Sequence, residues 1–200
     1  MDDRDAPPPH PLDYPFATLG ASFVQHGERT LELPPGGPDL TGRTPLLAYG
    51  ANASPAALTR KLANLPPAPL PVLRADLPGF DVVYSAHVSP YGAVPATLHP
   101  SPGTTVAVFV AYPDQAQLRA LTATEPNYEL TGLRDLDCRL EGDADLTELD
   151  AYLSRHGPLL LDGSPVALAS IEARDRRFPA IDQREAMEHA GDLPQPYRLP

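Results

Sequence analysis

Short apolar runs separated by proline- and glycine-rich turns dominate the hydrophobic pattern of this chain of 200 residues. The run over residues 45–49 is followed by a glycine and predicts a buried strand. Residues 50–53 predict a tight turn, after which Ser54 is a candidate helix N-cap and Pro55 takes the first helical position, where its missing N–H costs nothing. The segment therefore predicts a strand, a turn and a helix, and the helix presents one apolar face through Leu58, Leu62 and Leu65.

Further strands are predicted where β-branched and aromatic residues cluster or alternate with polar ones. Residues 100–103, Pro-Ser-Pro-Gly, predict a hairpin-like turn between two of these strands. Residues 145–155 carry leucines at helical spacing and predict an amphipathic helix that stops at Gly157. The remaining predictions are strands near residue 23 and over 30–33, 80–86, 94–99, 104–112 and 128–141, a hairpin over 159–171, and helices opening at Pro113-Asp114 and at Asp182.

These elements predict an α+β fold, because strands and helices do not alternate regularly along the chain. We expect a mixed, mostly antiparallel sheet that is closed or nearly closed, like a β-barrel, with flanking helices. Residues 1–15 lack periodicity, and their proline triplet favours an extended conformation, so they predict a flexible proline-rich arm that is dispensable for folding. Residues 16–200 then form a single domain.

The charge balance excludes several classes of partner. The net charge is −11, whereas nucleic acids and anionic membranes require a basic face on the protein that binds them. No apolar run approaches the roughly 18–20 residues of a membrane helix. Residues 1–5 are acidic where an export signal would be basic and then apolar, so we expect a cytoplasmic protein. The oligomeric state stays open.

Familiar catalytic and metal-binding motifs are absent from the sequence. A single cysteine, Cys138, excludes an internal disulfide and a multi-cysteine metal site, and its position in a predicted strand indicates a core thiol. Six scattered histidines form no ligand pair on a predicted helix, so we expect no metal. The basic stretch over residues 174–177 is expected to be a solvated face, with binding of a substrate carboxylate as the alternative.

Two features carry candidate chemistry. The glycine-centred turn over residues 50–52 leaves backbone N–H groups pointing into one concavity, where they could bind an anion or a polarised carbonyl. Glu125 lies just past a predicted helix C-terminus, and Pro126 keeps it extended. The helix dipole and partial burial would disfavour a negative charge there, which suits a general base. The alternatives are a junction that binds nothing and a solvated acid at a helix end.

The order of these motifs resembles that of the γ-glutamylcyclotransferase-like superfamily over about residues 45–130. In that family a Tyr-Gly-Ser-Asn motif follows the first strand, and the catalytic glutamate follows the helix after the central hairpin. Glu125 falls where the family glutamate is expected, and Tyr128 resembles the tyrosine that follows it. The residues that correspond to the first motif are Tyr49, Gly50 and Asn52, with Ala51 in place of its serine.

The resemblance implies an intramolecular acyl transfer. The α-amine of a γ-glutamyl group attacks its own γ-carbonyl, closes 5-oxoproline and expels an amine, with Glu125 as general acid and base. It implies a small γ-glutamyl substrate and no metal or organic cofactor. Two alternatives stay open, namely an inactive small-molecule-binding or protein-interaction module of the same fold and an unrelated α+β domain. The residues implied to bind substrate are Tyr49, Gly50, Ala51, Asn52 and Tyr128.

Overall fold

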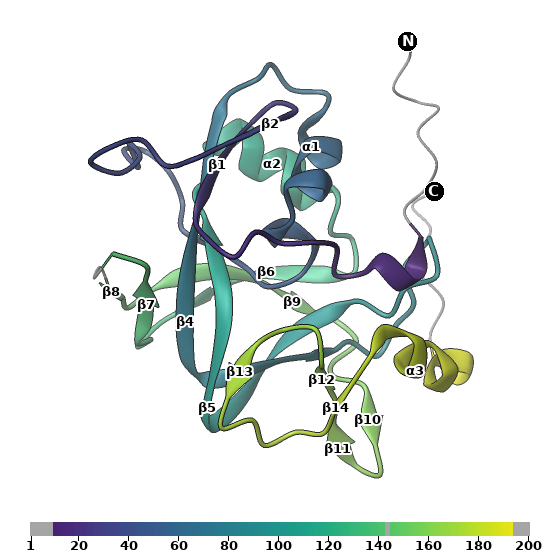
Figure 1. Ribbon diagram of the computed structural model, residues 1–200. Coiled ribbons are helices and arrows are strands. Elements are labelled where there is room, and N and C mark those ends of the chain that lie inside the picture. Colours follow the sequence, from purple (N-terminus) through teal and green to yellow (C-terminus); the bar gives the residue numbers. More distant parts are fainter. Residues whose placement is uncertain (1–9, 143–144, 194–200) are drawn as a thin grey trace.

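The structure is a computed structural model that describes residues 10–142 and 145–193. It contains a large sheet, a two-stranded hairpin and a few short helices (Figure 1). The helices are α1 (Pro55–Leu62), α2 (Gln115–Ala123) and α3 (Gln183–Glu188), with 3₁₀ turns η2 (Pro11–Asp13), η3 (Ala51–Ala53) and η4 (His189–Asp192). The strands are β1 (Phe23–His26), β2 (Arg29–Leu31), β3 (Leu46–Ala48), β4 (Pro69–Tyr84), β5 (Ala96–Ala111), β6 (Tyr128–Leu133), β7 (Cys138–Leu140), β8 (Asp145–Leu146), β9 (Leu149–Ser154), β10 (Leu160–Leu161), β11 (Ser164–Pro165), β12 (Ala167–Leu168), β13 (Ala173–Arg174) and β14 (Ala180–Ile181).

Two long antiparallel strands, β4 and β5, form the frame of the sheet (Figure 1). The strand order is β14-β12-β4-β5-β3-β9-β6, and the β3–β9 and β12–β14 pairs are parallel. This confirms the mixed, mostly antiparallel α+β prediction. The predicted closure is not confirmed, because β14 and β6 do not pair within the described residues and the sheet stays open. Among the described residues, β14 is a two-residue strand followed by α3, and β6 at the other end of the order pairs with β9 alone.

The predicted hairpin turn at residues 100–103 is wrong, because these residues lie inside the continuous strand β5. They face a register shift between Pro78 and Phe80 of β4. Gly79 and Gly103 both adopt positive φ there, a conformation that glycine reaches without steric cost. Proline and glycine therefore mark an irregularity in two paired strands and not a chain reversal. Proline and glycine are also the reason why the predicted strand began at residue 80, whereas β4 begins at Pro69.

The predicted helix over residues 145–155 is also wrong, because this segment forms β8 and β9. β9 lies between β6 and β3, and it buries Leu149, Ala151 and Tyr152. Pairing on both edges satisfies its backbone groups and outweighs the helical spacing of its leucines. The helices predicted after Ser54, Asp114 and Asp182 are confirmed as α1, α2 and α3. Ser54 is the α1 N-cap by position only, since its buried hydroxyl has no hydrogen-bond partner among the described residues.

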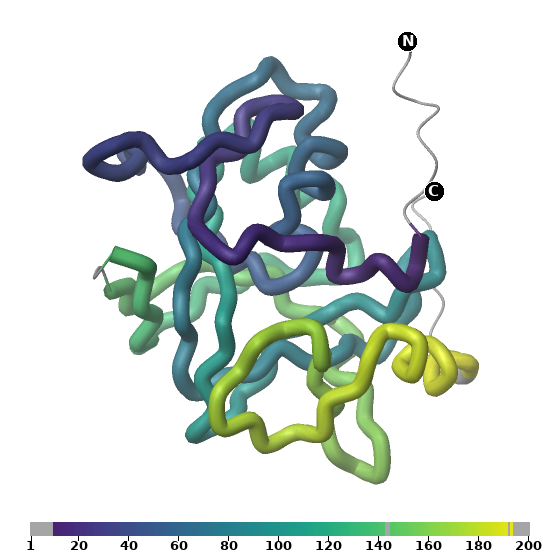
Figure 2. The backbone as a smooth tube through the Cα atoms, viewed as in Figure 1, coloured from purple at the N-terminus to yellow at the C-terminus, as the bar shows by residue number. Residues whose placement is uncertain are grey.

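The predicted flexible arm is packed against the domain over residues 10–15, the part of it that the structure describes. Residues 1–9 lie outside the described residues, but η2 packs beside α3, and Tyr14 is only 7% exposed. Figure 2 shows this purple segment crossing the front of the molecule. Residues 10–15 are therefore part of the packed domain, because a buried aromatic ring anchors them.

Helices α1 and α2 pack against one face of the sheet and bring their ends together. Leu58 of α1 and Leu121 of α2 are fully buried in a cluster with Leu46 of β3. A larger cluster joins β4 and β5 to β3, β7, β9 and the C-terminal elements β12, β14 and α3. Asp114 and Gln117 form a reciprocal capping box that starts α2. The burial of these leucines fixes the C-terminal end of α2 near the η3–α1 junction.

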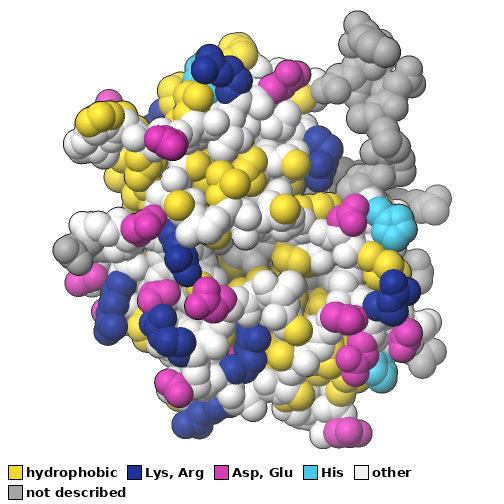
Figure 3. All heavy atoms as spheres, viewed as in Figure 1, with side chains coloured by type: hydrophobic (Ala, Val, Ile, Leu, Met, Phe, Trp, Pro, Cys, Tyr) yellow, Lys and Arg dark blue, Asp and Glu magenta, His cyan; other side chains and the backbone are white. Residues whose placement is uncertain are grey.

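The surface shown in Figure 3 carries acidic and basic side chains interspersed over its lower half. Across residues 10–142 and 145–193, no helix has the length and apolar character to cross a membrane. Cys138 is buried in β7, as its position predicted, and burial raises the pKa of its thiol to about 12. The thiol is therefore protonated at neutral pH.

The basic stretch over residues 174–177 is not a solvated face throughout. Arg176 donates to both carboxylate oxygens of the fully buried Asp81, at 3.0 and 3.1 Å, and also to the carbonyl of Ile171 at 2.8 Å. Arg174 pairs instead with Asp76 at 2.7 Å near the surface. The buried pair fastens the chain around β13 to β4 and lies outside the site described below.

We expect Arg176→Gln to lower the free energy of unfolding by about 3–5 kcal/mol, since it leaves the Asp81 carboxylate buried without its cation. Arg174→Gln is the matched control and should cost less than about 1 kcal/mol, because its ion pair is exposed. Denaturant titration followed by circular dichroism measures both values. Equal losses of unfolding free energy in the two variants would contradict the expectation that the buried ion pair contributes more to stability than the exposed one.

Candidate functional site

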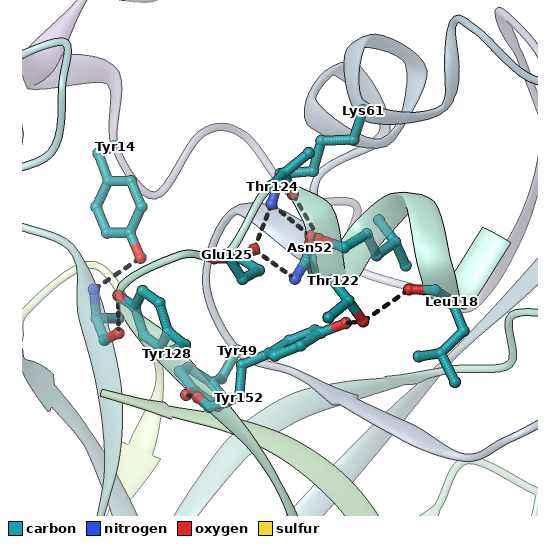
Figure 4. Close-up of polar contacts among 12 residues, drawn as sticks. Tyr14, Tyr49, Asn52, Lys61, Leu118, Thr122, Thr124, Glu125, Tyr128 and Tyr152 are labelled. Carbon is teal, nitrogen blue, oxygen red and sulfur yellow. Dashed lines mark hydrogen bonds and ion pairs between the residues drawn. The ribbon is translucent and has the colours of Figure 1, made fainter. Parts of the chain in front are cut away.

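The two features that the sequence singled out lie in one cavity of about 290 Å³. It opens between the β3–η3–α1 junction and the segment after α2 (Figure 4). Every predicted site residue lines it. These residues are Tyr49, Gly50, Ala51, Asn52, Glu125 and Tyr128.

Glu125 points into this cavity from the end of α2. Its N–H donates to the carbonyl of Thr122 at 3.0 Å, which continues the last turn of the helix. Its side chain is 14% exposed, so it is not the solvated acid of the alternative interpretation. The Oε1 atom accepts hydrogen bonds from Asn52 Nδ2 at 3.1 Å and from Lys61 Nζ at 2.5 Å.

Lys61 completes a triangle of polar contacts around this carboxylate (Figure 4). Its Nζ also donates to Asn52 Oδ1 at 2.8 Å, so the amide of Asn52 bridges the cation and the anion. The side chain of Lys61 is 17% exposed. Asn52 and Glu125, which the sequence placed at the ends of two separate elements, are thus in direct contact.

Tyr49 and Tyr152 join the floor of the cavity to α2. The Tyr49 hydroxyl donates to the backbone carbonyl of Tyr152, and the Tyr152 hydroxyl bonds Thr122 Oγ1 at 2.8 Å. Burial raises the pKa of Tyr49, and the nearby charge of Glu125 raises it further. Tyr49 therefore stays neutral and serves as a hydrogen-bond donor.

Tyr128 and Tyr14 hold the same residue of β5 from two sides. The Tyr128 hydroxyl donates to the carbonyl of Ala96 at 2.8 Å, and the Tyr14 hydroxyl accepts from its N–H at 2.8 Å (Figure 4). Burial raises the pKa of both phenols. Two neutral hydroxyls thus satisfy both the N–H and the carbonyl of Ala96 at the cavity edge.

Space requires glycine at position 50. Its φ is −131°, outside the left-handed region. A Cβ atom built on Gly50 would lie 2.5 Å from the Tyr14 hydroxyl oxygen, closer than such atoms can approach. Ala51 and Asn52 open η3, where the first N–H groups of a helical turn have no partner within it. Both residues line the cavity.

Sequence reasoning missed several residues that line the cavity. Lys61 carried a signal, because this chain uses lysine once and arginine at its other basic positions. It also lies four residues after Ala57 on the α1 face that lines the cavity. Tyr14 lay in a segment predicted to be flexible, and no local pattern identified it. The others that it missed include Phe16, Arg60, His87 and Tyr91.

His87 adds a neutral imidazole to the cavity wall. Its ring stacks on His156 with centroids 4.6 Å apart, and its Nδ1 bonds Ser85 Oγ at 2.7 Å. Burial, and secondarily the neighbouring His156, lowers the pKa of His87 to about 4. The His87 ring is therefore uncharged at neutral pH. Within the described ranges, no group of three His, Cys, Asp or Glu side chains is arranged to hold a metal.

Comparisons with known proteins give matches among solved structures. No protein-family model and no curated protein matches the chain. It is similar to a structure of gamma-glutamyl cyclotransferase (14% identity, TM-score 0.46) and to an uncharacterized protein from Homo sapiens (14%, 0.47), each covering 74% of this chain and 99% of the other. It is also similar to a solution structure of a protein from Arabidopsis thaliana, with 21% identity and a TM-score of 0.44. That match covers 58% of this chain and 72% of the other chain. At these sequence identities and TM-scores, the similarities support no conclusion about activity.

We expect Gly50→Ala to destabilise the protein by about 1–3 kcal/mol, because its Cβ would overlap the Tyr14 hydroxyl. Tyr14→Phe removes that oxygen, after which the nearest atoms are at ordinary contact distances of 3.5 and 3.7 Å. In the double variant, Gly50→Ala should therefore cost much less than it does alone. A double-mutant cycle by thermal denaturation measures the coupling, and additive losses would contradict the proposed overlap.

Proposed function

We propose that this protein is a γ-glutamylcyclotransferase-like enzyme that converts a γ-glutamyl amine or peptide to 5-oxoproline and releases the amine. The observation that supports it is the Glu125 carboxylate, which faces the cavity and is held there by Asn52 and Lys61. A positioned carboxylate within reach of a bound substrate is what a general base requires. The proposal rests on this geometry together with the motif order in the sequence.

The chemistry can be written with each proton accounted for. Glu125 takes a proton from the substrate's α-ammonium group, and the freed nitrogen attacks the γ-carbonyl carbon, which closes a five-membered ring. The protonated Glu125 then gives that proton to the leaving nitrogen as its bond to the γ-carbon breaks. The regenerated carboxylate takes the second proton from the ring nitrogen, which becomes the amide N–H of 5-oxoproline, and passes it to the released amine. Ring closure within one molecule supplies much of the rate, and no step requires a metal or an organic cofactor.

The turn over residues 50–52 is suited to the charge that develops on the γ-carbonyl oxygen. Backbone N–H groups fixed before the reaction stabilise an oxyanion without reorganising. Asn52, Tyr49 and Tyr128 complete the polar lining that would orient the substrate. Ala51 retains the backbone N–H that the serine of the resembled motif would have, but it supplies no hydroxyl group. The missing hydrogen bond would cost substrate affinity about 0.5–1.5 kcal/mol if that hydroxyl contacts the substrate.

Lys61 gives the site an electrostatic means of activating the substrate. A substrate ammonium that approaches Glu125 must also approach the Lys61 ammonium, which lies 2.5 Å from the same carboxylate oxygen. Repulsion between like charges disfavours the protonated form of the substrate amine. The incoming amine therefore loses its proton at a lower pH than it would beside a neutral side chain, while the same ammonium makes Glu125 a weaker base until their contact opens.

The proposed partner is a small γ-glutamyl compound, and the proposed location is the cytoplasm. The net charge of −11 favours neither nucleic acid nor an anionic membrane as a partner. A reducing compartment suits a chain with one cysteine.

A binding module without catalysis is the second candidate. The Lys61–Glu125 contact favours it, since that ion pair must open or rearrange before the carboxylate accepts a proton from another amine. Such a module would bind γ-glutamyl compounds and release no 5-oxoproline. A thermal shift on ligand addition without turnover would identify it.

We expect Glu125→Gln to lower 5-oxoproline formation by about 10²–10⁴-fold, because the amide cannot accept and return a proton. The measurement is mass spectrometry of reactions with a panel of γ-glutamyl amino acids and γ-glutamyl amines. Glu129→Gln is the matched control, since Glu129 is exposed on β6 and does not line the cavity. Turnover that survives in Glu125→Gln would exclude Glu125 as the base.

We expect Lys61→Gln to lower kcat at pH 7 by about tenfold or more, and the loss should shrink as the pH is raised. The neutral side chain no longer repels the substrate ammonium, so a higher pH is needed to free the amine. Lys61→Arg keeps the charge and should retain much of the rate. Arg119→Gln removes an exposed positive charge from α2 and serves as the control. A loss that is constant across pH would indicate a purely structural role for Lys61.

A further inference from the structure

Residues 10–16 contribute to one side of the candidate site, although residues 1–15 were predicted to form a flexible arm. Tyr14 and Phe16 both line the cavity that holds Glu125. The purple segment that carries them crosses the molecule in Figure 2, and Figure 4 places the Tyr14 ring beside Tyr128 at the cavity. The segment reaches the site from more than thirty residues upstream of the β3–η3 turn.

Tyr14 anchors this segment by contacts that leave little freedom. Its hydroxyl accepts from the Ala96 N–H at 2.8 Å, and the same oxygen occupies the space left by the missing side chain of Gly50. Burial, with smaller contributions from Tyr91 and from the charge of Glu125, raises its pKa. The ring is thus wedged between the turn over residues 50–52 and the first residue of β5.

Phe16 continues the wall with a cluster of ring contacts. Its ring meets Tyr14 edge-on with centroids 5.8 Å apart and lies 6.1 Å from the ring of Tyr91. The guanidinium of Arg60 lies over the Phe16 ring, 5.0 Å from its centroid. These contacts place an aromatic surface at the edge of the cavity.

The backbone of Phe16 shows that this position is imposed by its surroundings. Its φ is +71°, a left-handed conformation that a bulky side chain adopts at a cost. Residues persist in such conformations only where surrounding contacts hold them, and these positions cluster at ligand clamps. The ring contacts of Phe16 are the contacts that offset this cost.

We propose that Tyr14 and Phe16 are specificity-determining residues, which form the wall that limits the size of the molecule bound beside Glu125. The identity of that molecule rests on the proposed function, in which the wall restricts the substituent on the leaving amine. A cavity of about 290 Å³ with aromatic rings at one edge accepts a compact apolar substituent and excludes a bulky one.

The single lysine of the chain tests this wall without any assumption about catalysis. Lys61 lines the same cavity, so its acylation rate reports access to the cavity. Wild-type protein, Phe16→Ala and Phe16→Leu would be treated with an acetyl and a biotinyl N-hydroxysuccinimide ester, and peptide mass spectrometry would follow Lys61. We expect Phe16→Ala to react at least about fivefold faster with the biotinyl ester, with a smaller gain for the acetyl ester and an intermediate effect in Phe16→Leu.

Phe178→Ala is the matched control for these variants. Phe178 is half-buried like Phe16, but its ring contacts His99 at 5.6 Å and lies outside the cavity lining. Its removal should leave the acylation of Lys61 unchanged with both esters. Circular dichroism and melting curves would confirm that each variant is folded. Equal acylation rates in wild type and Phe16→Ala would overturn the proposal.

Substrate preference provides the second measurement. For 5-oxoproline release, the ratio of kcat/KM for γ-glutamyl-tryptophan to that for γ-glutamyl-glycine should rise about tenfold in Phe16→Ala and stay constant in Phe178→Ala. If the wild type turns over no γ-glutamyl compound, the proposed function fails while the acylation experiment still decides the wall. If turnover depends on Glu125 but the ratio and the acylation rates do not change, the wall fails alone.

Discussion

The structure of the site depends on one carboxylate oxygen that receives two donors from a different part of the chain. Asn52 reaches Glu125 from the η3 turn, Lys61 reaches it from the last turn of α1, and the two donors also contact each other. A negative charge that is mostly removed from water is costly unless it is paired and hydrogen-bonded. This triangle meets that requirement and fixes the end of α2 against the start of α1. The cavity is the space that remains beside it.

Much of the fold near the site followed from local sequence signals. A short apolar run, a glycine and a helix-starting proline identified β3, η3 and α1, because each element is encoded within a few residues. Long-range pairing explains the errors. β9 has helical leucine spacing but sits between two strands, and the prolines of β4 are tolerated because they fall where its ladder is irregular or at its start.

The candidate site was partly visible in the sequence for a similar reason. Glu125 and Asn52 lie at the ends of predicted elements, and binding and catalytic residues are often found in such connecting segments. Lys61 lies in the last turn of α1, and only its rarity in this chain set it apart. Tyr14 became part of the site through an interaction across 82 residues of sequence, with the N–H of Ala96. No local rule predicts a contact of that range.

The irregularity in the middle of the β4–β5 pair affects whether strands of two molecules of this protein can pair with each other. Among the described residues, the other strands that pair with this part of β4 do so at Ala75–Asp76 and at Val83, which leaves the backbone between them without a second strand partner. A neighbouring molecule could extend the sheet there, as happens in fibrils, if a regular row of N–H groups were presented. Pro78 lacks that donor, and the bulge at Gly79 breaks the row. The irregularity at Pro78 and Gly79 thus disfavours edge-to-edge pairing between molecules, which is a route to aggregation.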